Sequence, residues 1–296
     1  MKKALLLLSL AVYSATMALQ AQPISRGKLI EGLAMPTKLL DKPVKYCVYL
    51  PPDYETSQRR YPVVYLLHGY TDDETGWVQF GEAPRIADQA IAAGEIPPMI
   101  IVMPDAGVTW YVNDYQGKVK YEDMFVKEFI PYIDKTYRTR AKKEFRGISG
   151  LSMGGHGSLL YAMHHPDLFV ACAAFSSAIY TDETMRTMED ASYNKMFADL
   201  YSGKVTGNAR LTDTWRKNNT LQLAQTLPEE SLKKVNWYLD CGDDDFLYEG
   251  NALIHVALRN RSIPHEFRVR DGAHNWTYWR TGLPEGLKFI GHHFHR

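Results

Sequence analysis

The sequence predicts an α/β fold, a mostly parallel central sheet with helices on both faces. Three observations lead to this prediction. Short apolar runs rich in β-branched residues recur along the 296-residue chain. Stretches with apolar residues at three- and four-residue spacing lie between them, as in amphipathic helices. Several of the short runs are apolar at every position, as in a strand buried on both faces. Strands that alternate with helices in this way form parallel sheets covered on both sides.

The individual elements follow from the same patterns. The runs predicted to be strands are Val44 to Leu50, Val63 to Leu67, Met99 to Met103, Phe145 to Ile148, Val170 to Phe175, Val235 to Leu239 and Phe267 to Val269. The clearest helical stretches are Tyr121 to Tyr137, Met153 to His164 and Tyr248 to Asn260. Each strand is short and each helix is longer, which is the usual relation of lengths in an α/β domain.

The domain organisation is predicted to be simple. No repeat, low-complexity tract or glycine- and proline-rich linker divides the chain, so residues 22–296 are expected to form a single domain. The gap of residues 176–234 is longer than one crossover requires and is rich in charge. This segment is either a partly helical cap over one edge of the sheet or a surface insertion, and the sequence favours neither.

The first residues have the three parts of a secretory signal peptide. Lys2 and Lys3 precede the apolar run Ala4 to Val12, and small and polar residues follow as far as Ala21. A membrane anchor would need about 18 to 20 apolar residues, and this run is interrupted soon after Val12. We therefore expect residues 1–21 to be a signal peptide that is cleaved after Ala21, and the mature protein to be periplasmic or secreted, without a membrane attachment.

Charge and cysteine content exclude some partners. Lysine plus arginine and aspartate plus glutamate number 34 each, so no net field attracts nucleic acid or an anionic membrane. A small or neutral partner is expected. The three cysteines Cys47, Cys172 and Cys241 lie in apolar runs. Buried free thiols are the favoured interpretation, with a Cys172–Cys241 disulfide as the alternative.

The sequence Gly150-Leu-Ser152-Met-Gly154 is the strongest chemical motif. A Gly-x-Ser-x-Gly match alone is weak, but here a strand-like run precedes the serine and a helix-like run follows it, as a nucleophile elbow requires. The two glycines allow strand and helix backbones to approach at a strained turn. The serine hydroxyl would then project at the positive end of the helix. Ser152 is therefore the predicted nucleophile of an α/β-hydrolase fold.

The other two members of a catalytic triad should follow Ser152 in the order acid, then histidine. His274 lies in a glycine-containing loop just after a strand, which makes it the predicted base. The acid should follow the preceding strand, where Asp243, Asp244 and Asp245 are adjacent, and spacing alone does not choose among them. The late histidines His292, His293 and His295 are interpreted as a solvated terminal tail, and no metal site is predicted.

The oxyanion hole is predicted from the first strand–loop junction. The strand Val63 to Leu67 ends in His68-Gly69-Tyr70, which brings backbone to the sheet edge where the second donor of this fold is found. We assign the two donors to the backbone amides of Tyr70 and Met153. His68 itself is expected to be structural.

With these residues identified, the chain resembles the esterase D and feruloyl esterase group of α/β-hydrolases, the carbohydrate esterase family one type, over nearly the whole mature length. The motifs that carry the resemblance are Tyr46 to Tyr54, Tyr61 to Gly69, Gly150 to Gly157, Gly242 to Leu247 and Gly272 to Trp276. In the family pattern the acid lies three residues after the glycine that corresponds to Gly242, which points to Asp245. The resemblance implies acyl transfer through an acyl-enzyme on Ser152, without a cofactor.

The resemblance also suggests a substrate class. Export suits an ester of a glycan, an oligosaccharide or another small molecule, and argues against the cytosolic formylglutathione hydrolase branch. Aromatic residues near the predicted site are Trp77, Trp110, Tyr111, Phe246, Trp276 and Trp279. Of these, Trp77, Trp110, Phe246 and Trp276 are the expected substrate-binding residues, since flat rings stack on phenolic acids or sugars.

Feruloyl esters of plant xylan are therefore the favoured substrates. The alternatives are an acetylxylan esterase, an exported esterase of broad specificity, and a non-catalytic hydrolase fold that binds glycans.

Overall fold

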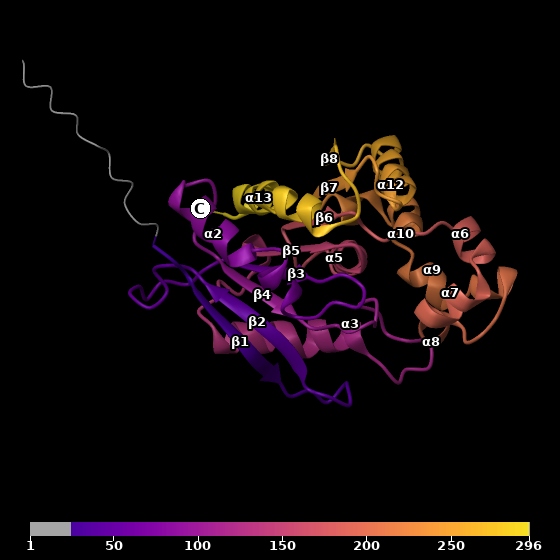
Figure 1. Cartoon of the computed structure of the whole chain (residues 1–296), viewed down its shortest axis with the longest axis horizontal. Coiled ribbons are helices and arrows are strands. Elements are labelled where there is room, and N and C mark those ends of the chain that lie inside the picture. Colours follow the sequence, from indigo (N-terminus) through magenta and orange to yellow (C-terminus); the bar gives the residue numbers. More distant parts are fainter. Residues whose placement is uncertain (1–24, 296) are drawn as a thin grey trace, which may run out of the picture.

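The computed structural model describes residues 25–295, so the predicted signal peptide lies outside the described residues. One eight-stranded sheet runs through the molecule in the order β1-β2-β4-β3-β5-β6-β7-β8 (Figure 1). Its strands are β1 (Lys28–Met35), β2 (Val44–Leu50), β3 (Val63–Leu67), β4 (Ile100–Pro104), β5 (Arg146–Leu151), β6 (Ala171–Phe175), β7 (Asn236–Gly242) and β8 (His265–Arg270).

The sheet is parallel except at one edge. β2 pairs antiparallel with both β1 and β4, whereas β4, β3, β5, β6, β7 and β8 are parallel to one another. The carboxyl ends of six strands therefore lie along one edge of the sheet, where the loops of an open α/β sheet form ligand sites. The predicted α/β architecture is confirmed.

Helices of very different length surround the sheet. They are α1 (Gly76–Gln79), α2 (Ala83–Ala92), α3 (Tyr121–Met124), α4 (Ile130–Thr136), α5 (Met153–His164), α6 (Asp182–Thr187), α7 (Asp190–Met196), α8 (Ala198–Tyr201), α9 (Asp213–Asn218), α10 (Thr220–Thr226), α11 (Glu229–Leu232), α12 (Tyr248–Asn260) and α13 (Trp276–His293). The longer ones, α5, α12 and α13, lie next to the sheet, and α6 to α9 lie at one end of the molecule (Figure 1).

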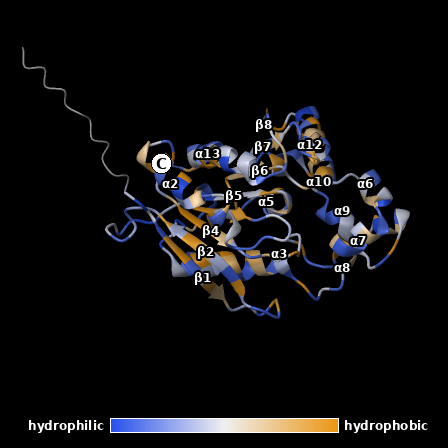
Figure 2. Ribbon diagram, in the orientation of Figure 1, coloured by the Kyte–Doolittle hydropathy of each residue, from blue (hydrophilic) through white to orange (hydrophobic). Residues whose placement is uncertain are grey.

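Both faces of the sheet are buried, which explains why its strands are apolar at successive positions. In β3, Val63, Tyr65 and Leu67 belong to one core cluster, and the residues between them, Val64 and Leu66, belong to a second cluster on the other face. Figure 2 shows hydrophobic residues concentrated along the strands and hydrophilic residues on the outer sides of the helices. A parallel sheet covered by helices on both faces requires side chains that alternate between two cores.

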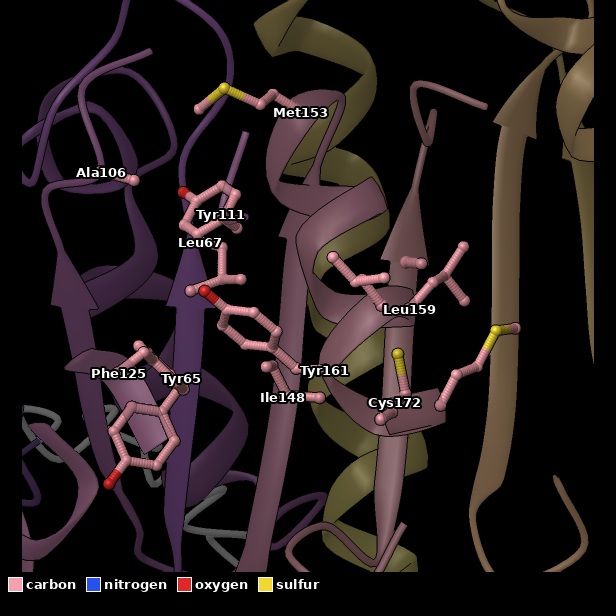
Figure 3. Close-up of a cluster of buried hydrophobic side chains, with 14 of the residues drawn as sticks. Tyr65, Leu67, Ala106, Tyr111, Phe125, Ile148, Met153, Leu159, Tyr161 and Cys172 are labelled. Carbon is pink, nitrogen blue, oxygen red and sulfur yellow. The ribbon is translucent and has the colours of Figure 1, made fainter. Parts of the chain in front are cut away.

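Different helices cover the two faces of the sheet. Helices α2 and α13 supply residues to the cluster that contains Val64. Helices α3, α4, α5 and α12 supply residues to the other cluster. On the face that carries Tyr65, Tyr161 of α5 lies next to Ile148 of β5, and Leu159 lies near Cys172 of β6 (Figure 3). The helix that begins with the residue after Ser152 is thus held by the larger core.

Several predicted elements differ from those observed. The edge strand β1 and the long helix α13 were not predicted. His292 and His293 lie in α13, so the interpretation of these residues as a solvated tail is wrong. The predicted helix Tyr121 to Tyr137 is interrupted by a π-helical turn over Phe125–Phe129. All seven predicted strands are present, with ends shifted by a few residues.

The structure decides between the two alternatives for the cysteines and describes the elements of the long insertion. Cys47, Cys172 and Cys241 are all buried free thiols, so the Cys172–Cys241 disulfide does not form. The segment between β6 and β7 contains the helices α6 to α11. Its Phe197 packs against Trp110 with ring centroids 4.7 Å apart, which joins the insertion to the loop after β4.

The turn between β5 and α5 depends on glycine. A Cβ added to Gly154 would lie 2.4 Å from the carbonyl oxygen of Leu67 and 2.6 Å from that of His68. Backbone atoms cannot move aside as the end of a flexible side chain can. Gly150 makes a similar approach, since its Cβ would lie 2.4 Å from the Gly154 carbonyl oxygen. These contacts hold α5 close to the carboxyl ends of β3 and β5.

Gly154→Ala is expected to lower the free energy of unfolding by about 2 kcal/mol, the middle of the usual range for overpacking. Helix propensity alone predicts the opposite sign, because alanine is favoured over glycine by about 1 kcal/mol inside a helix. Urea unfolding followed by circular dichroism measures the difference. Gly69→Ala is the matched control, because the one atom within 3 Å of its Cβ would be the end of the Leu151 side chain, at 2.7 Å. Equal stability of the two variants would contradict this account.

Candidate functional site

The candidate site lies at the carboxyl edge of the sheet, in the loops after five of its six parallel strands. Ser152 directly follows β5, Tyr70 follows β3 and Trp110 follows β4. Asp245 follows β7, and His274 follows β8. Residues that are up to 204 positions apart in the sequence therefore meet because parallel strands end at the same edge.

Ser152 occupies a strained backbone conformation, with φ of 55° and ψ of −117°. Its amide donates a hydrogen bond of 2.9 Å to the Phe175 carbonyl, and its own carbonyl accepts from His156 and Ala178, each at 3.0 Å. Three backbone hydrogen bonds thus hold Ser152 at a φ that residues other than glycine rarely adopt. Such strain persists only where the surroundings fix it, and it is typical of functional turns.

Ser152, His274 and Asp245 form one hydrogen-bonded chain. Nε2 of His274 lies 2.9 Å from Oγ of Ser152, and Nδ1 lies 2.9 and 3.0 Å from the two carboxylate oxygens of Asp245. Because an ionised carboxylate only accepts hydrogen bonds, Nδ1 carries the proton and Nε2 is free to accept the hydroxyl proton of Ser152. The base is therefore in the tautomer that can activate the serine.

Asp245 is the acid that the geometry brings to the histidine. Asp243 and Asp244 are exposed, and Asp243 accepts a hydrogen bond from the amide of Gly272 instead. Asp245 is only 1% exposed, and Oδ1 also accepts from the amide of Leu247 at 2.8 Å. The ambiguity that sequence spacing left among the three carboxylates is removed by their positions.

The charge of Asp245 is stabilised in place. Burial alone would raise the pKa of this carboxyl, but hydrogen bonds from His274, the Leu247 amide and the Ser176 hydroxyl outweigh it and lower the pKa below its usual value. The side chain of Ser176 also accepts a hydrogen bond of 3.0 Å from the indole of Trp279. Trp279 in turn meets the His274 ring edge to face, at 4.9 Å. The imidazole is thus held by both an ionised partner and an aromatic contact.

The two residues predicted to donate amides to an oxyanion belong to segments that meet at Ser152. Met153 follows Ser152 and is the first residue of α5, so no carbonyl within the helix accepts its amide proton. Gly69 and Tyr70 line the same cavity as Ser152, and a Cβ on Gly69 would lie 3.6 Å from the Ser152 Cβ. The loop after β3 therefore lies next to the turn that carries the serine.

Hydrogen bonds of the His68 ring hold the loop that carries Tyr70. Its ring is buried, with Nδ1 2.8 Å from the Gly69 carbonyl and Nε2 2.8 Å from the Ala106 amide. These partners require Nδ1 to donate and Nε2 to accept. The Tyr111 hydroxyl donates to the His68 carbonyl at 3.0 Å. The loops after β3 and β4 are fixed to each other in this way.

A cavity of about 710 Å³ opens in front of Ser152. Among the predicted binding residues, Trp110, Phe246 and Trp276 line it. Phe246 is 71% exposed, and its ring centroid lies 4.6 Å from that of His274. Trp77 is not part of the lining: its buried indole donates to the Leu67 carbonyl at 2.8 Å, and its ring supports Trp276 edge to face.

Sequence reasoning missed part of the lining. Phe80, Tyr180 and Met196 also face the cavity, and the last two come from the insertion between β6 and β7. That segment therefore contributes to one wall of the cavity. An aromatic residue soon after β6 was the one available signal, because carboxyl-end loops form the site in this type of fold.

A small second cavity, of about 10 Å³, adjoins the first behind Trp110 and Tyr180. Trp110 Nε1, His156 Nε2 and Thr220 Oγ1 have no hydrogen-bond partner among the described residues, and all three side chains line this space. Burial lowers the pKa of His156 to about 4. His156 is therefore neutral near pH 7, and this end of the site carries no charge from it.

Comparison with known proteins identifies the family of the chain. Residues 37–290 match the Esterase family model. Esterase Rv1288 of Mycobacterium tuberculosis is 31% identical over 245 residues, which cover 77% of this chain and 51% of that protein. A xylanase/feruloyl esterase of Xylanibacter ruminicola is 38% identical over 49% of this chain and 21% of its own length. The chain thus spans about half of the first relative's length and about a fifth of the second's.

Among solved structures, a ferulic acid esterase superposes with a TM-score of 0.78 at 33% identity. The match covers 91% of this chain and 99% of that one. The fold, the matched family model and the identity over most of the length agree with one another. This chain belongs to the Esterase family of α/β-hydrolases, which are carboxylic ester hydrolases.

Proposed function

We propose that this chain is an exported serine esterase that hydrolyses feruloyl-type esters of plant xylan through an acyl-enzyme on Ser152. The observation that carries the proposal is the hydrogen-bonded chain from Ser152 through His274 to Asp245, at the edge of a cavity of about 710 Å³ with aromatic walls. Cavities of this size bind molecules of the size of a phenolic acid joined to a sugar.

The first half of the reaction forms the acyl-enzyme. His274 Nε2 removes the proton of Ser152 as Oγ attacks the ester carbonyl carbon. The amides of Tyr70 and Met153 donate to the oxyanion, and the amino end of the twelve-residue helix α5 adds a favourable field. The imidazolium then gives its proton to the ester oxygen of the sugar as the bond from the acyl carbon to that oxygen breaks, so the sugar leaves with a free hydroxyl. Water repeats the same steps, releases the acid and restores Ser152.

Asp245 positions the base and stabilises its charged form. The lowered pKa of Asp245 keeps the carboxylate ionised near neutral pH, so it holds Nδ1–H and favours the imidazolium that forms during attack. Because the carboxylate is buried, this interaction is only weakly screened by water.

The aromatic lining supports a cinnamoyl rather than an acetyl group. Trp110, Trp276 and Phe246 offer flat faces to a planar ring, and an acetyl group is too small to contact all three. The ferulic acid esterase that is 33% identical over 91% of this chain adds support from outside the molecule. The relative named as a xylanase/feruloyl esterase supports xylan as the polymer.

Export forms part of the proposal because the substrate is a plant polymer. Residues 1–21 have the charge, apolar run and small residues of a signal peptide. Within residues 25–295, no helix is both long and apolar enough to cross a bilayer.

Asp245→Asn should lower kcat for a feruloyl ester by roughly 10,000-fold, since an amide favours the wrong histidine tautomer. Asp243→Asn, at an exposed neighbouring carboxylate, is the control and should keep kcat within a factor of two to three. Initial rates with methyl ferulate measure both. Comparable losses in the two variants, or retained activity in Asp245→Asn, would argue against the assigned triad.

Substrate preference is measured on feruloylated and acetylated arabinoxylan oligosaccharides, with products separated by chromatography. The proposal predicts that wild type releases ferulate and that Ser152→Ala does not. Trp276→Ala should raise KM for the feruloyl ester several-fold, as loss of about 1 kcal/mol of aromatic contact implies. Release of acetate alone would make the protein an acetylxylan esterase, and release of neither acid would remove xylan as the substrate.

Signal cleavage is tested by intact-mass measurement of the protein recovered outside the cytoplasm. The expected amino-terminal residue is Gln22. Leu7→Asp, which places a charge in the apolar run, should leave the full-length chain inside the cell. Export of the unprocessed chain, or normal processing of Leu7→Asp, would contradict the prediction.

A further inference from the structure

A polar cluster lies where α3, α9 and the end of α5 opposite Ser152 meet. Oε1 of Glu122, in α3, lies 2.8 Å from Nδ1 of His164 and 2.9 Å from Nε2 of His165. His164 ends α5, and His165 is the next residue. None of the three has a role in the proposed reaction. The cluster therefore requires an explanation of its own.

The hydrogen bonds of His164 leave its two ring nitrogens in unequal roles. Nε2 lies 3.0 Å from the carbonyl oxygen of Lys217, which can only accept, so Nε2 carries a proton. Nδ1, on the other side of the ring, lies 2.8 Å from Oε1 of Glu122 and is the nitrogen that remains for a metal ion.

The contacts of His164 are those of a histidine that binds a metal. Nδ1 of His164 would offer its lone pair to the metal, while Nε2–H remains on the Lys217 carbonyl. Histidine ligands usually donate their other N–H to a carbonyl or carboxylate in this manner, which fixes the ring.

The geometry of the cluster suits a small metal site. The candidate ligand atoms of Glu122, His164 and His165 all lie within 4.8 Å of one another. Around a tetrahedral zinc ion with bonds of about 2.0 to 2.1 Å, neighbouring ligand atoms are roughly 3.3 Å apart. The hydrogen-bonded separations need to lengthen by only about half an ångström, which small side-chain rotations allow.

The cluster of Glu122, His164 and His165 is open to solvent on one side. The side chains of Glu122 and His164 are 8% and 12% exposed, whereas that of His165 is 31% exposed. A metal can reach the cluster on the His165 side and take water as its fourth ligand. Two imidazoles and one carboxylate favour zinc and its neighbours over calcium or magnesium, which prefer oxygen ligands only.

We propose that Glu122, His164 and His165 bind one divalent ion of the zinc type, and that this ion fastens the insertion between β6 and β7 to the nucleophile helix. The link to the insertion is the carbonyl of Lys217 in α9, held by Nε2 of His164. The site was not predicted from the sequence because Glu122 is 42 residues away from His164. This inference does not depend on the identity of the ester substrate.

Other clusters in the described part of the chain lack the same features. Asp243, Asp244 and Asp271 are grouped but fully exposed, and exposed carboxylates commonly gather without an ion. His255 and His265 lie 2.7 Å apart, with no carboxylate completing a group of three. The His255–His265 pair provides a matched control for the histidine substitutions.

The test uses mature, tag-free protein treated with a chelator and then dialysed. Zinc is titrated by calorimetry, and bound metal is counted by elemental analysis. Wild type should bind one zinc ion per chain, and its Tm should rise with zinc concentration. His165→Gln and Glu122→Gln should weaken zinc binding roughly 100-fold or more, because loss of even an outer partner of a ligand costs about 10- to 100-fold. His255→Gln should bind as wild type does.

Two further readouts keep the result unambiguous. Circular dichroism establishes that each variant is folded, and methyl ferulate hydrolysis in the absence of metal should be retained in His165→Gln. Cobalt in place of zinc should give visible absorption bands of a tetrahedral site in wild type and not in Glu122→Gln. No saturable zinc binding in wild type, or zinc binding as tight as that of wild type in folded His165→Gln and Glu122→Gln, would overturn the proposal.

Discussion

The close approach of α5 to the ends of β3 and β5 is the constraint on which the rest of the site depends. Gly154 sits where any Cβ would collide with the Leu67 carbonyl, and this contact sets where the helix begins. The position of Ser152, the free amide of Met153 and the distance to the loop of Tyr70 all follow from it. The packing of α5 in the larger core holds the helix in place, and with it the positive φ of Ser152. Stability and catalytic geometry therefore share one set of contacts.

Around this turn, the sheet topology brings distant residues together. Parallel strands end at one edge of the sheet. The loops after β7 and β8 therefore place Asp245 and His274 next to Ser152. The insertion between β6 and β7 adds Tyr180 and Met196 to the cavity wall, so a segment outside the sheet can influence which acyl group fits. The proposed metal cluster would act on that same segment, by tying α9 to the far end of the nucleophile helix.

Much of this could be predicted from the sequence, and the failures have physical causes. The elbow is a local motif, so Ser152 and the elements around it were predictable. Choosing Asp245 required the family pattern, because three adjacent carboxylates differ only in direction. Helix α13 escaped prediction because it contains glycines and a proline, which disfavour helices in isolation. A Cβ on Gly286 would lie 2.4 Å from the ring of Phe175, so packing against the sheet requires the residue that local propensity penalises.

The central claim is that Ser152 performs the ester cleavage, and covalent titration tests it most directly. A fluorophosphonate is added in sub-stoichiometric steps, the modified residue is identified by peptide mass spectrometry, and ferulate release is assayed at each step. The account predicts one adduct, on Ser152, with activity falling in proportion to the labelled fraction and reaching zero at one equivalent. Ferulate release that persists when Ser152 is fully modified would contradict it.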